Sequence, residues 1–227
     1  TYTVDLGAGD DIVYLTTNAS SINGNTGTDE AIVRAFDGFV DVYIDLQFST
    51  YFVPSKLTAQ DGMDVSLENF EKVTIDGNVA ATILGTSAAD TLVGDTAADT
   101  ITGRGGADTL TGGSKSDTFV FTTGDTGITL DTADTITDFS TGNDKIDIAT
   151  VGSYVEADGS GNANIAAFIT DADASLPTTS IDIYAEYNFN GEGNTLVVID
   201  EDKSGGVNAG DTLIILSGLS TADGLDA

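Results

Sequence analysis

A nine-residue hydrophobic period runs through the middle of the chain. In every unit one apolar residue follows a threonine, and the units succeed one another without a gap. The apolar positions are Ile83, Leu92, Ile101, Leu110 and Phe119. So short a repeat is typical of a solenoid, because a single short strand cannot bury its inward side chain until coils stack. The pattern therefore predicts an all-β fold, a parallel β-roll or β-solenoid in which alternate three-residue strands form two opposite sheets.

Two polar columns keep the same register as the apolar one. Glycine opens the units at Gly85, Gly94, Gly103 and Gly112, and aspartate precedes the strands at Asp90, Asp99, Asp108 and Asp117. Units of one sheet lie two repeats apart, so Asp90 should stack on Asp108 at one edge and Asp99 on Asp117 at the other. Carboxylates about 5 Å apart repel by about 3 kcal/mol at an effective dielectric of 20. A hard cation between them reverses the sign, and carbonyls of the glycine turns complete an oxygen shell of the kind that calcium takes.

This block resembles the RTX nonapeptide repeat, GGxGxDxUx. The resemblance implies a parallel β-roll with calcium between its turns, and export by the type I secretion system of a Gram-negative bacterium. The second and fourth motif positions depart from glycine in most units: they are Thr86, Asp95, Arg104 and Gly113, and Ala88, Ala97, Gly106 and Lys115. A residue other than glycine costs roughly 1 kcal/mol where a turn needs positive φ. We therefore expect two calcium ions here rather than four, with Gly106 in a ligating turn and Arg104 and Lys115 partly replacing a cation.

The N-terminal region, residues 1–82, carries a fainter version of the same arrangement. Residues 6–15 and 24–33 align Asp11 with Asp29 two coils apart, which would place both carboxylates at one edge as a further metal site. Two Gly-Asp turns between ordinary strands are the alternative interpretation. The alternating segments IVYL, AIVRA, FVDVYIDL and EKVTIDG predict strands that extend the solenoid, whereas residues 47–65 break the period and predict a long loop.

Beyond the repeat block of residues 83–122, residues 123–227 predict a C-terminal capping and secretion-type region. Short strands around Phe139 and at 146–148, separated by the turn residues STGN, predict an antiparallel pair that closes the last coil. Asp134 and the acids that follow it suggest another calcium site, for which ordinary turn-lining acids are the alternative. The alternating Tyr184, Tyr187 and Phe189 suit either glycan stacking or a core strand, the commoner case.

Residues 200–211 follow the spacing of a calcium loop, D-x-D-x-S-G-x5-D. The side chains of Asp200, Asp202, Ser204 and Asp211 fall at places 1, 3, 5 and 12, and Gly206 offers its carbonyl at place 7. Aspartate stands where a glutamate usually chelates, and its shorter arm is less suited to binding with both oxygens. The flanks TLVVI and TLIILSG predict strands, so this is an EF-hand-like loop in a β context, and a plain hairpin loop is the alternative. It also resembles the strand-loop-strand endings of RTX proteins.

Charge and composition restrict the function further. The chain has 37 acidic and 7 basic residues, a formal charge of −30, and neither histidine nor cysteine. Nucleic acid would be repelled, and the usual nucleophilic triads and zinc or copper sites lack their residues. No apolar run is long enough for a membrane span, so membrane insertion is not expected. We accordingly expect no catalytic activity within these residues.

The resulting hypothesis is a calcium-binding structural C-terminal module of a type I secreted bacterial surface protein similar to an S-layer subunit. Such a module would fold on calcium binding outside the cell, with the secretion apparatus as one partner. A surface array formed by self-association, or a cell-surface polysaccharide, would be another. The alternative is the RTX secretion and folding module of a secreted hydrolase, such as a protease, lipase or alginate-modifying enzyme, or of an adhesin.

Overall fold

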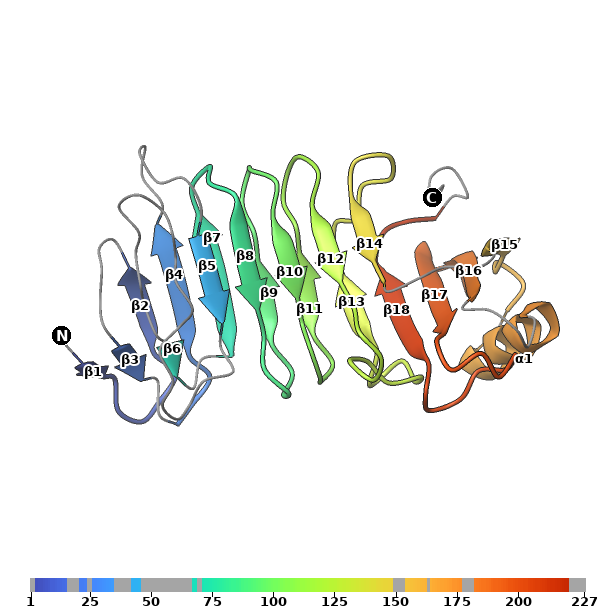
Figure 1. Ribbon diagram of the computed structural model, residues 1–227, viewed down its shortest axis with the longest axis horizontal. Helices are drawn as coiled ribbons and strands as arrows, with labels where there is room; N and C mark the ends of the chain where they lie inside the picture. Colours follow the sequence, from blue (N-terminus) through green and yellow to red (C-terminus); the bar gives the residue numbers. More distant parts are fainter. Residues whose placement is uncertain are drawn as a thin grey trace.

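The structure is a computed structural model that describes residues 3–15, 21–23, 26–34, 42–45, 67–68, 71–148, 154–162, 164–176 and 182–220. The molecule is elongated, with a stack of short parallel strands in its middle and a C-terminal unit at one end (Figure 1). Residues 47–65, which the sequence predicts as a loop, fall outside the described residues.

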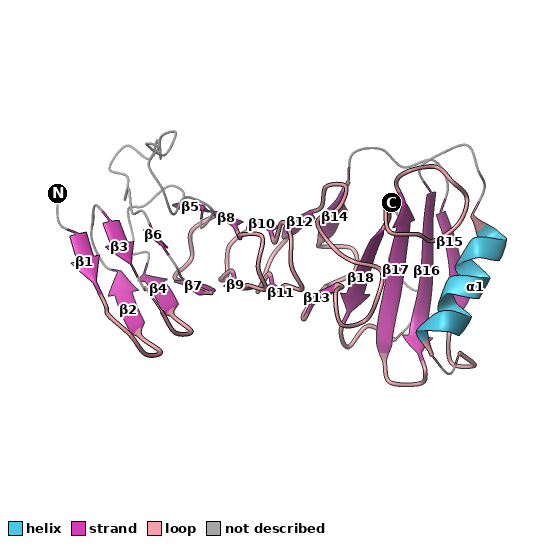
Figure 2. Ribbon diagram, turned by 90° about the horizontal axis from the view of Figure 1, so that it is seen from below, coloured by secondary structure: helices cyan, strands magenta, loops and turns pink. Residues whose placement is uncertain are grey.

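The middle of the molecule is a two-sheet parallel roll. One sheet contains β5 (Val42–Asp45), β8 (Ala81–Leu84), β10 (Thr100–Thr102), β12 (Thr118–Val120) and β14 (Lys145–Asp147). The opposite sheet contains β2 (Ile12–Leu15), β4 (Glu30–Arg34), β7 (Lys72–Asp76), β9 (Thr91–Val93), β11 (Thr109–Thr111) and β13 (Asp134–Ile136). Figure 2 shows the two layers facing each other. The predicted all-β roll is confirmed.

Register and burial follow the nine-residue period. Thr100 pairs with Thr82 and Thr109 with Thr91, so strands two units apart are neighbours. The middle residue of each short strand points inward, and Ile101 and Leu110 are fully buried between the sheets. This thin aliphatic core gains from every added coil, because each new strand covers the inward residue of the last.

The prediction of an antiparallel strand pair directly after the repeats is wrong. β13 pairs in parallel with β11, whereas β14 pairs in parallel with β12 in the opposite sheet. The turn residues STGN therefore belong to a turn of the roll and not to a hairpin. The physical reason is that Ile136 and Ile146 continue the inward apolar positions, so adding two more coils buries them where a hairpin would not.

The C-terminal unit supplies the antiparallel strands that the sequence predicts after the roll. β16 (Asp182–Phe189), β17 (Asn194–Asp200) and β18 (Thr212–Leu216) form an antiparallel sheet, and β15 (Tyr154–Asp158) joins β16 in parallel. β18 also pairs in parallel with β13, so one ten-stranded sheet runs from the roll into this unit.

A helix and an aromatic cluster complete the C-terminal unit. Helix α1 (Ile165–Ser175) begins after Asn164, whose side chain accepts hydrogen bonds from two backbone N–H groups of the first turn. Phe168 of this helix packs against Tyr184 and Phe189 of β16, with ring centroids 5.6 and 6.3 Å away. Tyr184 and Phe189 are buried, which confirms the core interpretation for these two, whereas Tyr187 is only partly buried.

The N-terminal region continues the solenoid as the alternating segments predict. β2, β4 and β7 pair in parallel and lead into β9. A small parallel sheet of β1 (Thr3–Asp5), β3 (Ser21–Asn23) and β6 (Leu67–Glu68) lies beside them. No helix in the described ranges is long and apolar enough to cross a membrane.

Candidate metal centres

The aspartates that precede the strands form two hydrogen-bonded columns along the edges of the roll. At one edge the backbone N–H of Asp90 donates to Oδ1 of Asp108, 2.8 Å away, and the N–H of Asp108 donates to Oδ1 of Asp134 at the same distance. We call this the first acid column. At the other edge Asp99 donates in the same way to Asp117, 2.8 Å away, and this second acid column continues to Asp144. The predicted stacking is confirmed.

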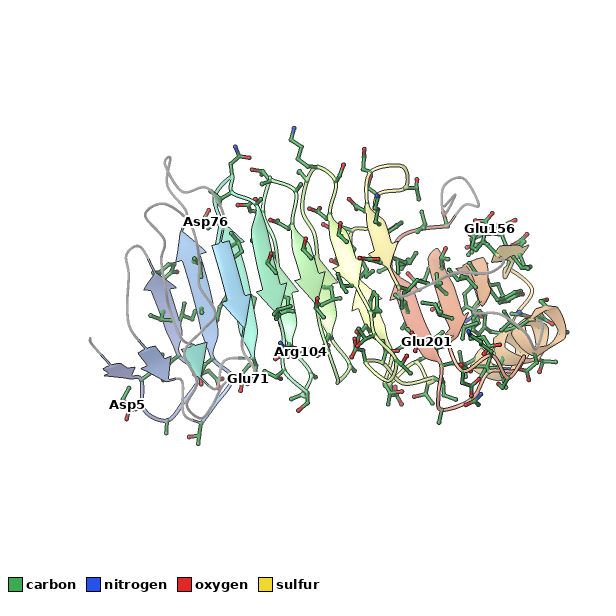
Figure 3. The ribbon with its side chains drawn as sticks, viewed as in Figure 1. Asp5, Glu71, Asp76, Arg104, Glu156 and Glu201 are labelled. Carbon is green, nitrogen blue, oxygen red and sulfur yellow. The ribbon has the colours of Figure 1, made fainter. Side chains whose placement is uncertain are left out.

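The first acid column extends to the N-terminal coils. The N–H of Asp11 donates to Oδ1 of Asp29 at 2.9 Å, and the N–H of Asp29 donates to Oε2 of Glu71 at 2.8 Å. The predicted stacking of Asp11 and Asp29 at one edge is confirmed. Glu71 is a member that the sequence analysis missed, although it precedes its strand directly, as the aspartates do. In Figure 3, Glu71 lies on the same long side of the molecule as Arg104 and Glu201.

The glycine that opens each unit makes room for the carboxylate of that unit. A Cβ atom on Gly103 would lie 2.2 Å from Oδ2 of Asp108, and one on Gly112 would lie 2.5 Å from Oδ2 of Asp117. Gly85 and Gly94 are in the same situation, and their added Cβ atoms would also meet a carbonyl oxygen of the next coil at 2.5 Å. These glycines are required by close packing, which also keeps turn carbonyls near the carboxylates.

The four repeat turns fall into two kinds. In the first two, the carboxylate is satisfied within its own turn: Oδ2 of Asp90 accepts from the N–H of Thr86 at 2.6 Å, and Oδ2 of Asp99 accepts from that of Asp95 at 2.8 Å. The last two turns have positive φ at the second and fourth motif positions. Those residues are Arg104, Gly106, Gly113 and Lys115, with φ of 69°, 127°, 104° and 87°.

A buried carboxylate oxygen without a partner occurs at one of the two later turns, that of Asp108, and at neither of the first two. Oδ2 of Asp108 is buried and has no hydrogen-bond partner in the described part of the chain, and the same holds for Oδ2 of Asp134, Asp11 and Asp29. An unpaired buried carboxylate oxygen costs about 1–3 kcal/mol or more, so it requires a proton or a cation. The turn geometry thus favours cation binding at some rungs of the column and not at all of them. The expected number of two ions stays a prediction.

Arginine supplies a cation at one rung. Nη1 of Arg104 donates to the carbonyl oxygen of Gly85 at 2.6 Å, across the interval between two coils. Its charge also lowers the pKa of Asp90, although burial is the larger effect and leaves that pKa raised. Lys115 is exposed and forms no ion pair with another described residue. The expectation of a built-in cation therefore fits Arg104 better than Lys115.

The column carboxylates are hard to ionise. Burial, together with the smaller effects of Asp125 and of the neighbouring column acids, raises the pKa of Asp108 to about 7 and that of Asp134 to about 8. Burial and the charges of Asp144, Asp99 and Asp138 raise the pKa of Asp117 to about 6. Because the charged forms are disfavoured, a divalent cation would stabilise these positions strongly.

The N-terminal pair shares the geometry of the last two repeat turns. Gly7 and Gly9 have φ of 96° and 123°, at the places that Arg104 and Gly106 occupy in their unit. Gly27 packs so closely on the preceding coil that a Cβ atom would lie 2.1 Å from the carbonyl oxygen of Gly9. The Oδ2 atoms of Asp11 and Asp29, which lack partners among the described residues, therefore belong to closely stacked coils with glycine turns.

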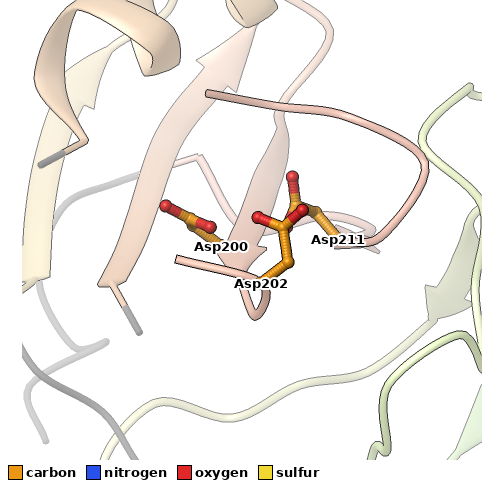
Figure 4. Close-up of side chains that lie close together, drawn as sticks. All are labelled: Asp200, Asp202 and Asp211. Atoms are coloured by element: carbon orange, nitrogen blue, oxygen red, sulfur yellow. The ribbon is translucent and has the colours of Figure 1, made fainter. Parts of the chain in front are cut away.

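The terminal loop brings three acids together between β17 and β18. Carboxylate oxygens of Asp200, Asp202 and Asp211 lie within 4.8 Å of one another, and Figure 4 shows the three side chains close together. Burial, together with the smaller effects of the charges of Asp200 and Asp202, raises the pKa of Asp211 to about 6. Hydrogen bonds from Ser204 and Asn208 lower the pKa of the exposed Asp202. The predicted strand-loop-strand arrangement is confirmed.

The remaining loop residues hold the carboxylates in place. The N–H groups of Ser204 and Gly205 donate to Asp200 at 3.2 and 2.9 Å, and the Ser204 hydroxyl donates to the Gly206 carbonyl at 3.1 Å. Helix α1 adds an acid that the sequence analysis missed, because Oδ1 of Asp173 accepts from the N–H of Val207 at 2.6 Å. Only the tertiary structure brings Asp173 to this loop, since 34 residues separate the two.

Comparison with known proteins agrees with the geometry of the middle block. Residues 84–119 match the family described as the RTX calcium-binding nonapeptide repeat, in four copies. No curated protein matches the chain. The block is thus an RTX repeat, a calcium-binding motif typical of secreted proteins, and the match includes neither Asp134 nor the terminal loop.

Proposed function

We propose, from the premise that residues 84–119 are RTX calcium-binding repeats, that the chain is a non-catalytic module that folds when it binds calcium outside the cell. The observation that carries this proposal is the column of stacked carboxylates in which the Oδ2 atoms of Asp11, Asp29, Asp108 and Asp134 are buried and lack partners among the described residues. Only a proton or a hard cation removes that cost. Such all-oxygen donor sets suit hard divalent cations, and the match to the calcium-binding repeat favours calcium among them.

Calcium would control folding through the charge of the whole chain. A formal charge of −30 on a fold with a thin core favours expanded states when no cation is bound. Extracellular calcium modules have dissociation constants of about 10⁻⁴ to 10⁻³ M, so their sites stay empty in the cytosol and fill outside. When the calcium concentration is about ten times the dissociation constant of a site, that site adds about 1.4 kcal/mol of stability. Several such sites together approach the stability of a whole domain. Export through a type I secretion channel would thus precede folding.

A structural role in a bacterial surface layer, similar to that of an S-layer subunit, accounts for the shape of the molecule better than an enzymatic one. The roll and the C-terminal unit share one ten-stranded sheet, which gives an extended and continuous body. The chain contains no histidine or cysteine to act as a general base or nucleophile. Calcium could also bridge acidic faces of neighbouring copies and so support an array.

Circular dichroism tests the proposal directly. Far-UV spectra are compared in EGTA, in about 10 mM calcium, which exceeds the dissociation constants typical of extracellular modules, and in magnesium at equal ionic strength. We expect β structure only with calcium, and sedimentation velocity in the same buffers tests for calcium-dependent assembly. A fully folded protein in EGTA that binds no calcium would overturn the folding role, and a monomer at every calcium concentration would overturn the array.

A further inference from the structure

One coil in the middle of the roll differs from the coil that follows it in the backbone of its turns. Residues 85–102 contain the first two repeat turns and the strands β9 and β10, one in each sheet, so they form one complete circuit of the solenoid (Figure 1). None of these residues, all of which the structure describes, has a positive φ. The later turns have positive φ at Arg104 and Lys115. We call residues 85–102 the central coil.

The first turn of the central coil surrounds its acid with hydrogen-bond donors. Oδ2 of Asp90 accepts from the backbone N–H of Thr86 at 2.6 Å and from the hydroxyl of the same residue at 2.9 Å. The Thr86 hydroxyl oxygen itself accepts from the N–H of Ala88 at 3.0 Å. Calcium needs acceptor oxygens that point at it, whereas this turn points donors at the carboxylate. The protein itself therefore stabilises the charge of Asp90.

The second turn of the central coil carries an additional aspartate where the motif has glycine. Asp95 is 8% exposed, and its Oδ1 and Oδ2 atoms accept from the N–H groups of Ala97 at 2.6 Å and of Val79 at 3.2 Å. The N–H of Asp95 donates to Oδ2 of Asp99 at 2.8 Å, and that of Ala81 donates to Oδ1 of Asp99 at 2.7 Å. All four carboxylate oxygens of this turn are thus satisfied by backbone donors, two of them from the preceding coil.

The corresponding turn of the next coil lacks these donors. Arg104 stands at the motif position of Thr86, and its φ is 69°. Oδ2 of Asp108 is the oxygen equivalent to the one that Thr86 satisfies at Asp90, and no donor among the described residues reaches it. The difference between the two coils therefore comes from the residue at the second motif position and the backbone conformation that it takes.

Turns that require a cation or a proton lie on both sides of the central coil. The Oδ2 atoms of Asp11 and Asp29 on its N-terminal side, and those of Asp108 and Asp134 on its C-terminal side, are buried without a partner among the described residues. The three acids of the central coil, all of them described, leave no buried oxygen unpaired. The coils on either side thus depend on a cation more than the central coil does.

The central coil is held to both neighbours by apolar burial. β9 pairs with β7 and β11, and β10 pairs with β8 and β12. Leu92 and Ile101, which β9 and β10 carry, are fully buried. One coil cannot cover these side chains alone, so the central coil still needs a neighbour before it is stable. In a solenoid each coil contacts only its neighbours, so folding can begin at one coil and spread along the stack.

We propose that the central coil needs no calcium ion of its own and that calcium-driven folding of the roll spreads from it in both directions. The motif alone makes Asp90 and Asp99 calcium ligands, but donors of the protein satisfy them here. Thr86 and Asp95, two departures from the glycine motif, therefore act in place of an ion. This inference rests on the proposed calcium-dependent folding and adds an order to it.

Hydrogen exchange of the full chain, measured by mass spectrometry over a series of calcium concentrations, tests this order. Peptides that cover residues 81–102 should become protected at a lower calcium concentration than peptides that cover residues 103–137. Asp95→Gly restores the motif glycine and removes the four backbone contacts of the buried carboxylate and its turn, so residues 81–102 should lose this advantage. The matched control is Asp131→Gly, which removes the same charge at an exposed position and should keep the parent order.

A milder variant keeps the test decisive if Asp95→Gly does not fold even with saturating calcium. Thr86→Val keeps the shape of the side chain and removes only the hydroxyl that donates to Asp90, so it should raise the calcium concentration at which residues 81–102 become protected. If the two regions of the parent become protected at one calcium concentration, or if Thr86→Val behaves as Asp131→Gly does, the proposed order is refuted while calcium-dependent folding stands. A parent chain whose exchange does not depend on calcium would refute both proposals.

Discussion

In the absence of calcium the roll should become more stable as the pH falls, and Asp117 shows why. Its side chain is 1% exposed, and burial raises its pKa from the ordinary 3.8 to about 6. An acid whose pKa is raised in the folded state favours folding while protonated, so stability is greatest below the unfolded value and is lost as pH rises through the folded one. A shift of about two pKa units corresponds to about 3 kcal/mol, an upper limit because acidic neighbours share the shift.

Asp117→Asn removes this cost while keeping an oxygen to accept the N–H of Asp99. In EGTA at pH 7.5 the free energy of unfolding of the variant should therefore exceed that of the parent by up to about 3 kcal/mol, which is measured as a larger content of β structure. With calcium the order should reverse, because the variant has lost a carboxylate ligand.

The assay is β-structure content by circular dichroism in EGTA between pH 8 and pH 4, with thermal melts wherever the chain is folded. The parent should gain β structure as the pH falls, and the variant should gain it at a higher pH. The two should draw together as the pH falls towards 3.8, the ordinary pKa at which the unfolded chain also begins to protonate Asp117. A variant that is less stable than the parent in EGTA at pH 7.5 would refute the reasoning.

Three further outcomes are expected. Gly103→Ala places a methyl group 2.2 Å from Oδ2 of Asp108, so it should destabilise the calcium-bound roll by about 1–3 kcal/mol in chemical unfolding, and an unchanged midpoint would contradict the packing role. Arg104→Gly removes the built-in cation beside Asp90 and should add one bound calcium ion by calorimetry; equal stoichiometry would show that the arginine blocks no site. Asp202→Ala should lower the number of bound calcium ions by one and leave the melting temperature of the roll unchanged. An unchanged number of ions would show that the loop is a plain turn.

The sequence alone determined the repeating part of the protein. In a solenoid, one local period decides which residue points inward, which residue lies over its equivalent two units away, and which glycine must make room. Ile101, Gly103 and Asp108 therefore keep the predicted positions in the stack. The loop between Asp200 and Asp211 was predictable for the same reason, because its three acids are close in the chain and its flanks pair directly.

The tertiary structure alone decided the features that depend on distant segments. Local turn residues favoured a hairpin at residues 137–144. In the structure β13 pairs with the edge of β11 and β14 with the edge of β12, so the two strands lie in different sheets. The approach of Asp173 to the terminal loop depends on how helix α1 packs, which no local period encodes.

The chemistry of the acid columns also depends on burial. Asp90 and Asp108 occupy the same position in their repeats, yet one carboxylate is satisfied by its own turn and the other keeps a free oxygen beside the C-terminal unit. The backbone conformation of each turn and the charges packed against it make that difference. A nine-residue period specifies where a carboxylate lies, and only the folded surroundings specify whether it needs a cation.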